Sequence, residues 1–163
     1  MTRRDLLVLA PLATLAALAP GPLLALDAPD FRATSLAKAN FTRASLKGKV
    51  VLIQFWATWC GFCRRDQPAV DEVYMDLAAK GLEVLAVNAR EPEKKVRAYL
   101  RESPRMVPVV LTADTNLMDV FPAPGFPTYI VLARDGKVAA AARGGQGQDG
   151  FARLLKQAGL SRG

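Results

Sequence analysis

Two nearly continuous runs of apolar residues stand out in the pattern of hydrophobic and polar positions. Residues 50–56 read VVLIQFW, and residues 82–87 read LEVLAV. Runs of this kind, rich in β-branched residues, are typical of strands that are buried on both faces of a sheet. We therefore predict that residues 50–56 form the centre of a sheet and that residues 82–87 form a second buried strand.

Three further segments carry apolar residues at helical spacing. The first ends at about residue 79, where Lys80 and Gly81 supply a basic last turn and a glycine stop. A second helix is expected to begin at Pro92. A last helix has Phe151 on its inner face, and we expect Asp149 to cap its N-terminus.

Shorter segments with the composition of strands complete the pattern. Residues 31–36 and 41–42 are expected to form two strands joined by a turn, and residues 107–111 a further strand. Residues 129–132 and 138–142 are expected to form a hairpin that turns at Asp135 and Gly136. Strands that alternate with helices, followed by a hairpin and a helix, predict an α/β sandwich with a mixed central sheet.

The first 26 residues differ from the rest of the chain. Arg3 and Arg4 precede an uncharged run over residues 6–26, which prolines divide into pieces shorter than the roughly 20 residues of a spanning helix. We predict an export signal over residues 1–26 and a single domain over residues 27–163. Residues 2–7 also resemble the twin-arginine export motif. The predicted location is periplasmic, and an uncleaved signal that anchors the chain in the membrane is the alternative.

Composition narrows the class of protein. The 163 residues include 22 Lys and Arg, 15 Asp and Glu, and no His, which gives a net charge of +7. The basic residues are scattered and are not interleaved with aromatics, so they favour solubility or acidic partners and argue against nucleic acid. The chain holds two cysteines. In an exported chain such a pair indicates either a structural bridge or a redox site.

Both cysteines lie in the stretch QFWATWCGFCRRDQP, residues 54–68. Cys60 stands where a buried strand ends and the next helix begins, so unpaired backbone N–H groups and the helix dipole favour its thiolate. Cys63 lies one turn further along the same helix, within reach of a mixed disulfide on Cys60. The spacing predicts that Cys60 is the nucleophile and Cys63 the resolving thiol.

Other uses of the pair fit the sequence less well. A bridge across two residues closes too small a loop to restrain the unfolded chain much, and a metal site needs four ligands. Covalent haem attachment requires a histidine directly after Cys63, where Arg64 stands. A peroxidase pattern, Pro-x-x-x-Thr-x-x-Cys, fails because Ile53 and Ala57 occupy the Pro and Thr positions. We expect neither a metal nor a cofactor.

The stretches LKGKVVLIQFWATWCGFCRRDQP and GFPTYIVLARDGKV resemble the exported thioredoxin-like thiol-disulfide oxidoreductases of the TlpA/ResA type, within the redoxin and AhpC-TSA group. The resemblance covers about residues 30–160. It implies a thioredoxin-like three-layer sandwich, with helices on both faces of a mixed sheet and an N-terminal β-hairpin extension.

The resemblance also implies the remaining site residues. Trp59 flanks the nucleophile, and Pro127 is a cis-proline beside the cysteines. Because proline has no N–H, the backbone of Phe126 can then pair with a substrate as an added strand. We expect Trp59, Phe62 and Phe126 to contact the substrate. Phe62 stands where thioredoxin has proline, and residues between the cysteines tune the reduction potential.

Asp66 is the candidate proton-transfer group. In thioredoxin a buried acid with this role precedes the first cysteine by six residues, where this chain has the neutral Gln54. The TlpA/ResA-type proteins often carry an acid six residues after that cysteine, which is the position of Asp66. The alternative is a solvated aspartate in a first turn, where acids are favoured anyway.

The function predicted from these features is reduction of protein disulfides outside the cytosol, in cytochrome c maturation or redox homeostasis. As the resemblance implies, a membrane thiol-electron donor would supply the electrons. We expect the chain to act as a monomer. Apocytochrome c is one candidate client. Two alternatives stay open, a disulfide donor of the same fold and a non-catalytic thioredoxin-like binding module.

Overall fold

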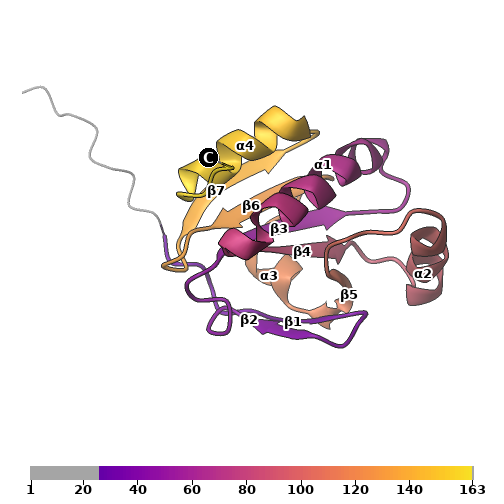
Figure 1. Cartoon of the computed structure of the whole chain (residues 1–163). Coiled ribbons are helices and arrows are strands. Elements are labelled where there is room, and N and C mark those ends of the chain that lie inside the picture. The colour runs from indigo at the N-terminus through magenta and orange to yellow at the C-terminus, as the bar shows by residue number, and fades with distance from the viewer. Residues whose placement is uncertain (1–25, 163) are drawn as a thin grey trace, which may run out of the picture.

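A seven-stranded mixed sheet runs through the computed structural model, which describes residues 26–162 (Figure 1). Its strands follow the order β2-β1-β5-β4-β3-β6-β7. Their bounds are β1 Arg32–Ser35, β2 Asn40–Thr42, β3 Val50–Trp56, β4 Leu82–Asn88, β5 Val109–Thr115, β6 Thr128–Leu132 and β7 Val138–Arg143. Strands β3, β4 and β5 are parallel, and the other neighbours are antiparallel.

The two long apolar runs form β3 and β4, and every residue of both strands is buried. This confirms the prediction of strands covered on both faces. The middle position of the sheet belongs to β4, and β3 lies next to it, between β4 and β6. All three loops at the C-terminal ends of the parallel strands therefore meet at one edge, where ligand and catalytic sites of such sheets form.

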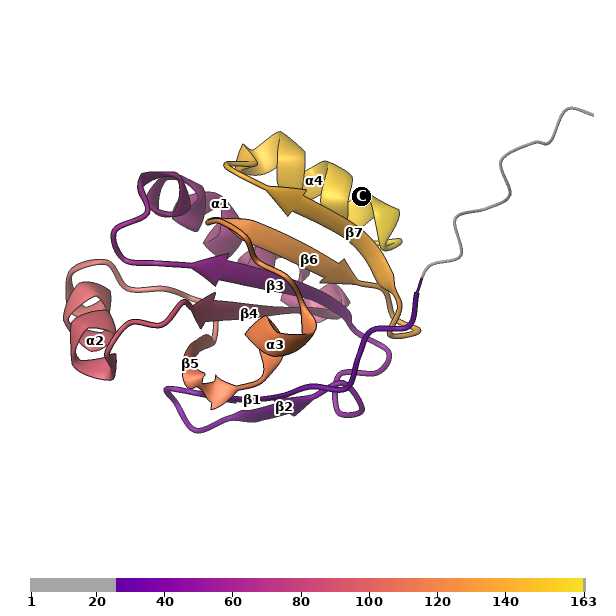
Figure 2. The ribbon, with the colours of Figure 1, turned by 180° about the vertical axis from the view of Figure 1, so that it is seen from behind.

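Helices cover both faces of the sheet, as predicted. The bounds are α1 Gly61–Leu77, a 3₁₀ turn Ala78–Lys80, α2 Glu93–Glu102, α3 Leu117–Val120 and α4 Gly147–Gln157. Figure 1 shows α1 and α4 together over one face, and Figure 2, seen from behind, shows α3 on the other. Apolar residues of α1 and α4 join one core cluster, and Leu117 of α3 joins the second.

The helix ends mostly follow the sequence. Gly81 has φ +92° and ends the turn that follows α1, in the left-handed conformation that glycine adopts without strain. The prediction that Asp149 caps the last helix is wrong. The helix α4 begins at Gly147 with Gln146 at its N-cap, so Asp149 lies in its first turn.

The predicted N-terminal hairpin is present as β1 and β2, and β1 pairs with β5 at the edge of the sheet. The chain between Leu26 and Ala28 bonds to the β6–β7 hairpin, through the Val138 N–H and the Gly136 carbonyl. The predicted export signal lies outside the described residues, apart from Leu26. Within residues 26–162 no helix is long and apolar enough to cross a membrane.

Candidate active site

The two cysteines form a disulfide at the N-terminus of α1, with their Cα atoms 5.2 Å apart. Cys60 is the N-cap residue of this helix, and its Sγ accepts a hydrogen bond from the Cys63 N–H at 3.1 Å. Both residues are buried, at 5% and 3% exposure. The sulfur of Cys60 thus faces the unpaired N–H groups of a helix start, where the positive end of the helix dipole favours a thiolate.

A glutamate holds the turn that leads from β3 into the cysteine pair. Glu91 follows β4, and its two carboxylate oxygens accept the N–H and the hydroxyl hydrogen of Thr58 at 2.7 and 2.6 Å. Asn88 and Lys95 donate to the same carboxylate, at 2.8 and 2.7 Å. Burial raises the pKa of Glu91, but the bonds from Lys95, Thr58 and Asn88 outweigh it and lower the pKa to about 2.

Exposed aromatic residues neighbour the two cysteines in the sequence. Trp59 and Phe62 are 62% and 56% exposed, unusual for residues of this size. The ring of Trp59 meets the half-buried Phe126 edge to face, with centroids 6.1 Å apart. The Arg65 guanidinium lies 4.2 Å above the ring of Phe62. The three residues predicted to contact substrate therefore lie at one edge of the sheet, and their role stays a prediction.

The Phe126–Pro127 peptide bond is cis, as the resemblance implied. Pro127 directly precedes β6, whose Thr128 pairs with Phe55 near the end of β3. This register places the proline at the same edge of the sheet as the cysteines. The Pro127 carbonyl accepts the Gly144 N–H at 2.9 Å, which fixes the loop against the β7–α4 connection.

Asp66 is buried, at 4% exposure, so the alternative of a solvated aspartate is wrong. It lies one turn beyond Cys63 on α1. Its Oδ2 accepts hydrogen bonds from the Tyr129 hydroxyl at 2.7 Å and the Gln146 N–H at 2.8 Å, and its Oδ1 accepts from the Gly147 N–H at 3.1 Å. The Asp66 carboxylate therefore caps the N-terminus of α4, a contact that was not predicted from the sequence.

The glycine-rich connection before α4 packs closely on this site. A Cβ atom added to Gly145 would lie 3.2 Å from Phe62 Cδ1 and 3.6 Å from Asp66 Oδ1. The glycine at this position thus lets the backbone approach two side chains at once. They are Phe62, which stands between the cysteines in the sequence, and the buried Asp66. The repeated glycines of residues 144–147 were the available signal in the sequence.

Behind Asp66 lies a chain of buried polar side chains. Gln54, on β3, donates from Nε2 to the Tyr129 hydroxyl oxygen at 3.3 Å. Its Oε1 accepts from Arg105 Nη2 at 2.6 Å. In the sequence, Gln54 stands out only because it replaces the acid of thioredoxin, and no local pattern marks Tyr129 or Arg105. Arg105 lies in the connection between α2 and β5.

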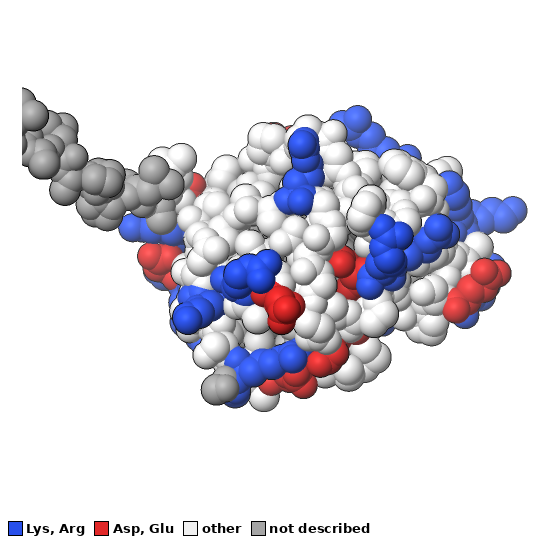
Figure 3. Space-filling view, turned by 90° about the horizontal axis from the view of Figure 1, so that it is seen from above, with Lys and Arg blue, Asp and Glu red and all other residues white. Residues whose placement is uncertain are grey.

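Charged side chains gather near the site without being confined to it. Figure 3 shows Lys and Arg side chains at the right-hand end of the molecule, toward which β3 and β4 run in Figure 1, and others at the opposite end. Arg64 and Arg65, near the start of α1, are both exposed. Among the described residues, no group of three or more His, Cys, Asp and Glu side chains is placed to hold a metal ion.

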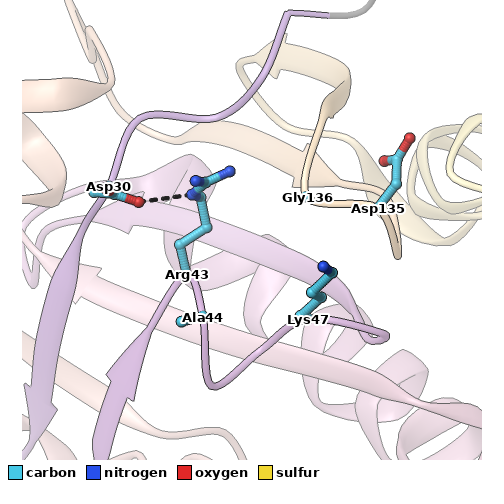
Figure 4. Close-up of a pocket in the computed structure, with 6 residues that line it drawn as sticks. All are labelled: Asp30, Arg43, Ala44, Lys47, Asp135 and Gly136. Atoms are coloured by element: carbon cyan, nitrogen blue, oxygen red, sulfur yellow. Dashed lines mark hydrogen bonds and ion pairs between the residues drawn. The ribbon is translucent and has the colours of Figure 1, made fainter.

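A pocket lies beside the start of β3 and the turn of the β6–β7 hairpin (Figure 4). Its lining consists of Asp30, Arg43, Ala44, Lys47, Asp135 and Gly136. Arg43 Nε and Asp30 Oδ1 form an ion pair in it at 2.8 Å. This pocket therefore does not contribute to the redox site.

Comparison with known protein families places the fold and the cysteine pair in context. A family model described as Redoxin matches residues 25–155. A thiol-disulfide oxidoreductase ResA of Bacillus cereus is 32% identical over 112 residues, which cover 69% of this chain and 65% of that protein. ResA of Bacillus thuringiensis subsp. konkukian is 28% identical over 131 residues, or 80% of this chain and 76% of that protein.

Solved structures show the same architecture. The crystal structure of a thiol:disulfide interchange protein of the thioredoxin family from Chlorobium tepidum TLS superposes with a TM-score of 0.72 at 29% identity. The superposition covers 81% of this chain and 94% of that one. The mixed sheet and its helices are therefore thioredoxin-like, as predicted.

Proposed function

Because this chain belongs to the Redoxin family and is a thioredoxin-like thiol-disulfide oxidoreductase, we propose that it reduces protein disulfides outside the cytosol. One observation carries the proposal. The only two cysteines of the chain are bonded to each other at a helix N-terminus, where the Sγ of Cys60 already accepts a backbone hydrogen bond. A structural staple would need neither this position nor the exposed aromatic residues around it.

The first step is attack by the Cys60 thiolate on one sulfur of a client disulfide. The new bond joins Cys60 to the client, and the client's other sulfur leaves as a thiolate and takes up a proton. The N-cap position favours the attacking thiolate, because the helix N–H groups and dipole stabilise negative charge on the sulfur. Trp59, Phe62 and Phe126 provide the surface on which the client segment lies, beside Pro127.

The second step is release of the reduced client. The Cys63 thiol loses its proton, and its sulfur attacks Cys60 Sγ, which expels the client's second thiolate. Two electrons pass from the dithiol to the client, and the chain is left with the Cys60–Cys63 disulfide that the structure contains. Asp66 accepts the proton from Cys63, since it is the buried carboxylate one turn along the same helix.

Electrons must then return to the pair from a thiol donor. In an exported protein this donor is a membrane thiol carrier, as the resemblance to the TlpA/ResA type implies. The client class is a protein disulfide, with the cysteine pair of apocytochrome c as the specific candidate. The arginine-led, proline-interrupted first 26 residues support export, either with cleavage or with the signal kept as an anchor. The working unit is the monomer.

The direction of electron transfer is tested by equilibrating the purified protein with glutathione redox buffers. A reductase requires a midpoint potential well below about −200 mV, whereas a value near about −120 mV would mark a disulfide donor. Reduction of insulin by the wild type and by Cys60→Ser tests the activity itself. We expect the substitution to abolish turnover. Full insulin reduction by the variant would refute the proposed cycle, and no reduction by the wild type would favour a binding module.

A further inference from the structure

Four side chains form a hydrogen-bonded chain in which three donors point in the same direction, toward the Asp66 carboxylate. Arg105 donates to Gln54 at 2.6 Å, Gln54 to Tyr129 at 3.3 Å, and Tyr129 to Asp66 at 2.7 Å. The members come from a loop, β3, β6 and α1, so the chain crosses from the flank of the sheet to the helix that carries the cysteines.

The direction of this chain depends on Arg105. A guanidinium group has donors and no acceptor, so the Gln54 carbonyl oxygen must face it. The amide nitrogen of Gln54 then faces the Tyr129 oxygen and occupies it as an acceptor. The hydroxyl hydrogen is left to point at Asp66. A residue without the donors of Arg105 would let the Gln54 amide turn over, and the tyrosine hydrogen would lose its fixed direction.

Burial makes this arrangement energetically important. Gln54 and Tyr129 have no exposed surface, and unpaired polar groups are costly in such surroundings. The Arg105 guanidinium lies 4.9 Å from the ring centroid of Trp56, itself buried. Burial and the bond to Asp66 raise the pKa of Tyr129, so its hydroxyl keeps its proton and serves as a donor.

We propose that Arg105 is a positioning residue for the thiol-disulfide site, which acts through Gln54 and Tyr129 to orient and hold the Asp66 carboxylate. The proposal rests on the proposed function, because Asp66 matters for turnover only if Cys63 must lose a proton in the second step. Arg105 itself touches neither cysteine. Its effect reaches the site by way of the two intervening side chains.

Other ionisable groups lie near this hydrogen-bonded chain and affect the charge of Arg105. Burial lowers the pKa of Arg105. Asp71 of α1 and Tyr99 of α2 lie close enough to act against burial and favour the charged form of the arginine. Asp71 also accepts the Met106 N–H at 3.1 Å, which holds the loop that carries the arginine. The helix α4 contributes backbone N–H groups to Asp66 and no ionisable side chain to this network.

The test follows the two steps separately in stopped-flow experiments with Ellman's reagent, which releases one coloured thiolate when Cys60 attacks and a second when Cys63 resolves the adduct. We compare Arg105→Met, Arg105→Lys and Tyr129→Phe with wild type between pH 4 and 9. Arg101→Met, which removes an exposed arginine at the end of α2, is the matched control. Near-ultraviolet circular dichroism confirms that each variant is folded.

We expect the pH–rate profile of the second step to shift by about half a unit or more in Arg105→Met and Tyr129→Phe, because the carboxylate that receives the Cys63 proton loses a donor that holds it in place. Arg105→Lys should recover at least half of the shift, and Arg101→Met should show none. The first step should keep its pH profile in all four variants.

A double variant tests whether Arg105 acts through Tyr129 or independently of it. If Arg105 acts through Tyr129, then Arg105→Met combined with Tyr129→Phe shifts the profile no further than Tyr129→Phe alone. Shifts that add in the double variant, or an Arg105→Met profile equal to that of wild type, would overturn the inference. Failure of the proposed two-step cycle would look different, because the wild type itself would then show no second release.

Discussion

The Tyr129 hydroxyl donates to Asp66 Oδ2 across 2.7 Å and so ties β6 to the helix that carries both cysteines. The same oxygen accepts the Gln146 N–H, and its partner Oδ1 accepts the Gly147 N–H. One carboxylate therefore joins α1, β6 and the start of α4. The residue that we assign to proton transfer also supports the fold, so its variants must be measured for both.

Replacing Asp66 with Asn should affect stability and catalysis together. An amide cannot accept from all three donors as a carboxylate does, so we expect a loss of about 1–3 kcal/mol in the free energy of unfolding. Release of the client should slow at least tenfold at pH 7. Urea unfolding and stopped-flow kinetics check the two effects. Asp149→Asn, an exposed acid in the first turn of α4, is the control.

The hydrogen bonds of Glu91 should make the free energy of unfolding fall at acid pH. Its pKa in the folded chain is about 2, below the ordinary value of 4.5. The contribution of its hydrogen bonds is therefore complete above pH 4.5 and is lost as the pH falls from there toward about 2. Glu91→Gln should flatten the fall in unfolding free energy across this window. Parallel slopes for wild type and variant would show that Glu91 is not involved.

The exposed aromatic residues should matter for protein clients and not for small disulfides. Trp59→Ala and Phe62→Ala remove apolar contact area beside Cys60, so kcat/KM for insulin should fall several-fold. The rate with Ellman's reagent should change less than twofold. Met75→Ala, an equally exposed residue on α1, is the control and should leave both rates unchanged. Equal losses with both substrates would contradict a docking role.

The sequence was sufficient for features whose cause is local. The run over β3 is apolar at nearly every position because both faces are covered, and the two cysteines follow it directly, so strand, helix start and redox pair could be predicted together. The end of α1 was predictable for the same reason, since Gly81 supplies the positive φ angle.

Features that depend on distant partners could not be predicted. Asp66 looks like an ordinary acid of a first turn, yet it meets Tyr129 and Gln146, 63 and 80 positions away. This also explains the wrong prediction for Asp149, because Asp66 already satisfies the N–H groups at the start of α4. No local pattern marks Arg105, whose partner Gln54 lies 51 positions away.

The central claim is that Cys60 attacks the client and Cys63 releases it, and a trapping experiment tests it most directly. The Cys63→Ser variant is reduced, mixed with a protein disulfide, quenched with acid and separated without reductant. We predict a covalent adduct through Cys60, identified by mass spectrometry and cleaved by dithiothreitol, and none with Cys60→Ser. No adduct with Cys63→Ser, or an adduct of equal yield through Cys63 in Cys60→Ser, would contradict the account.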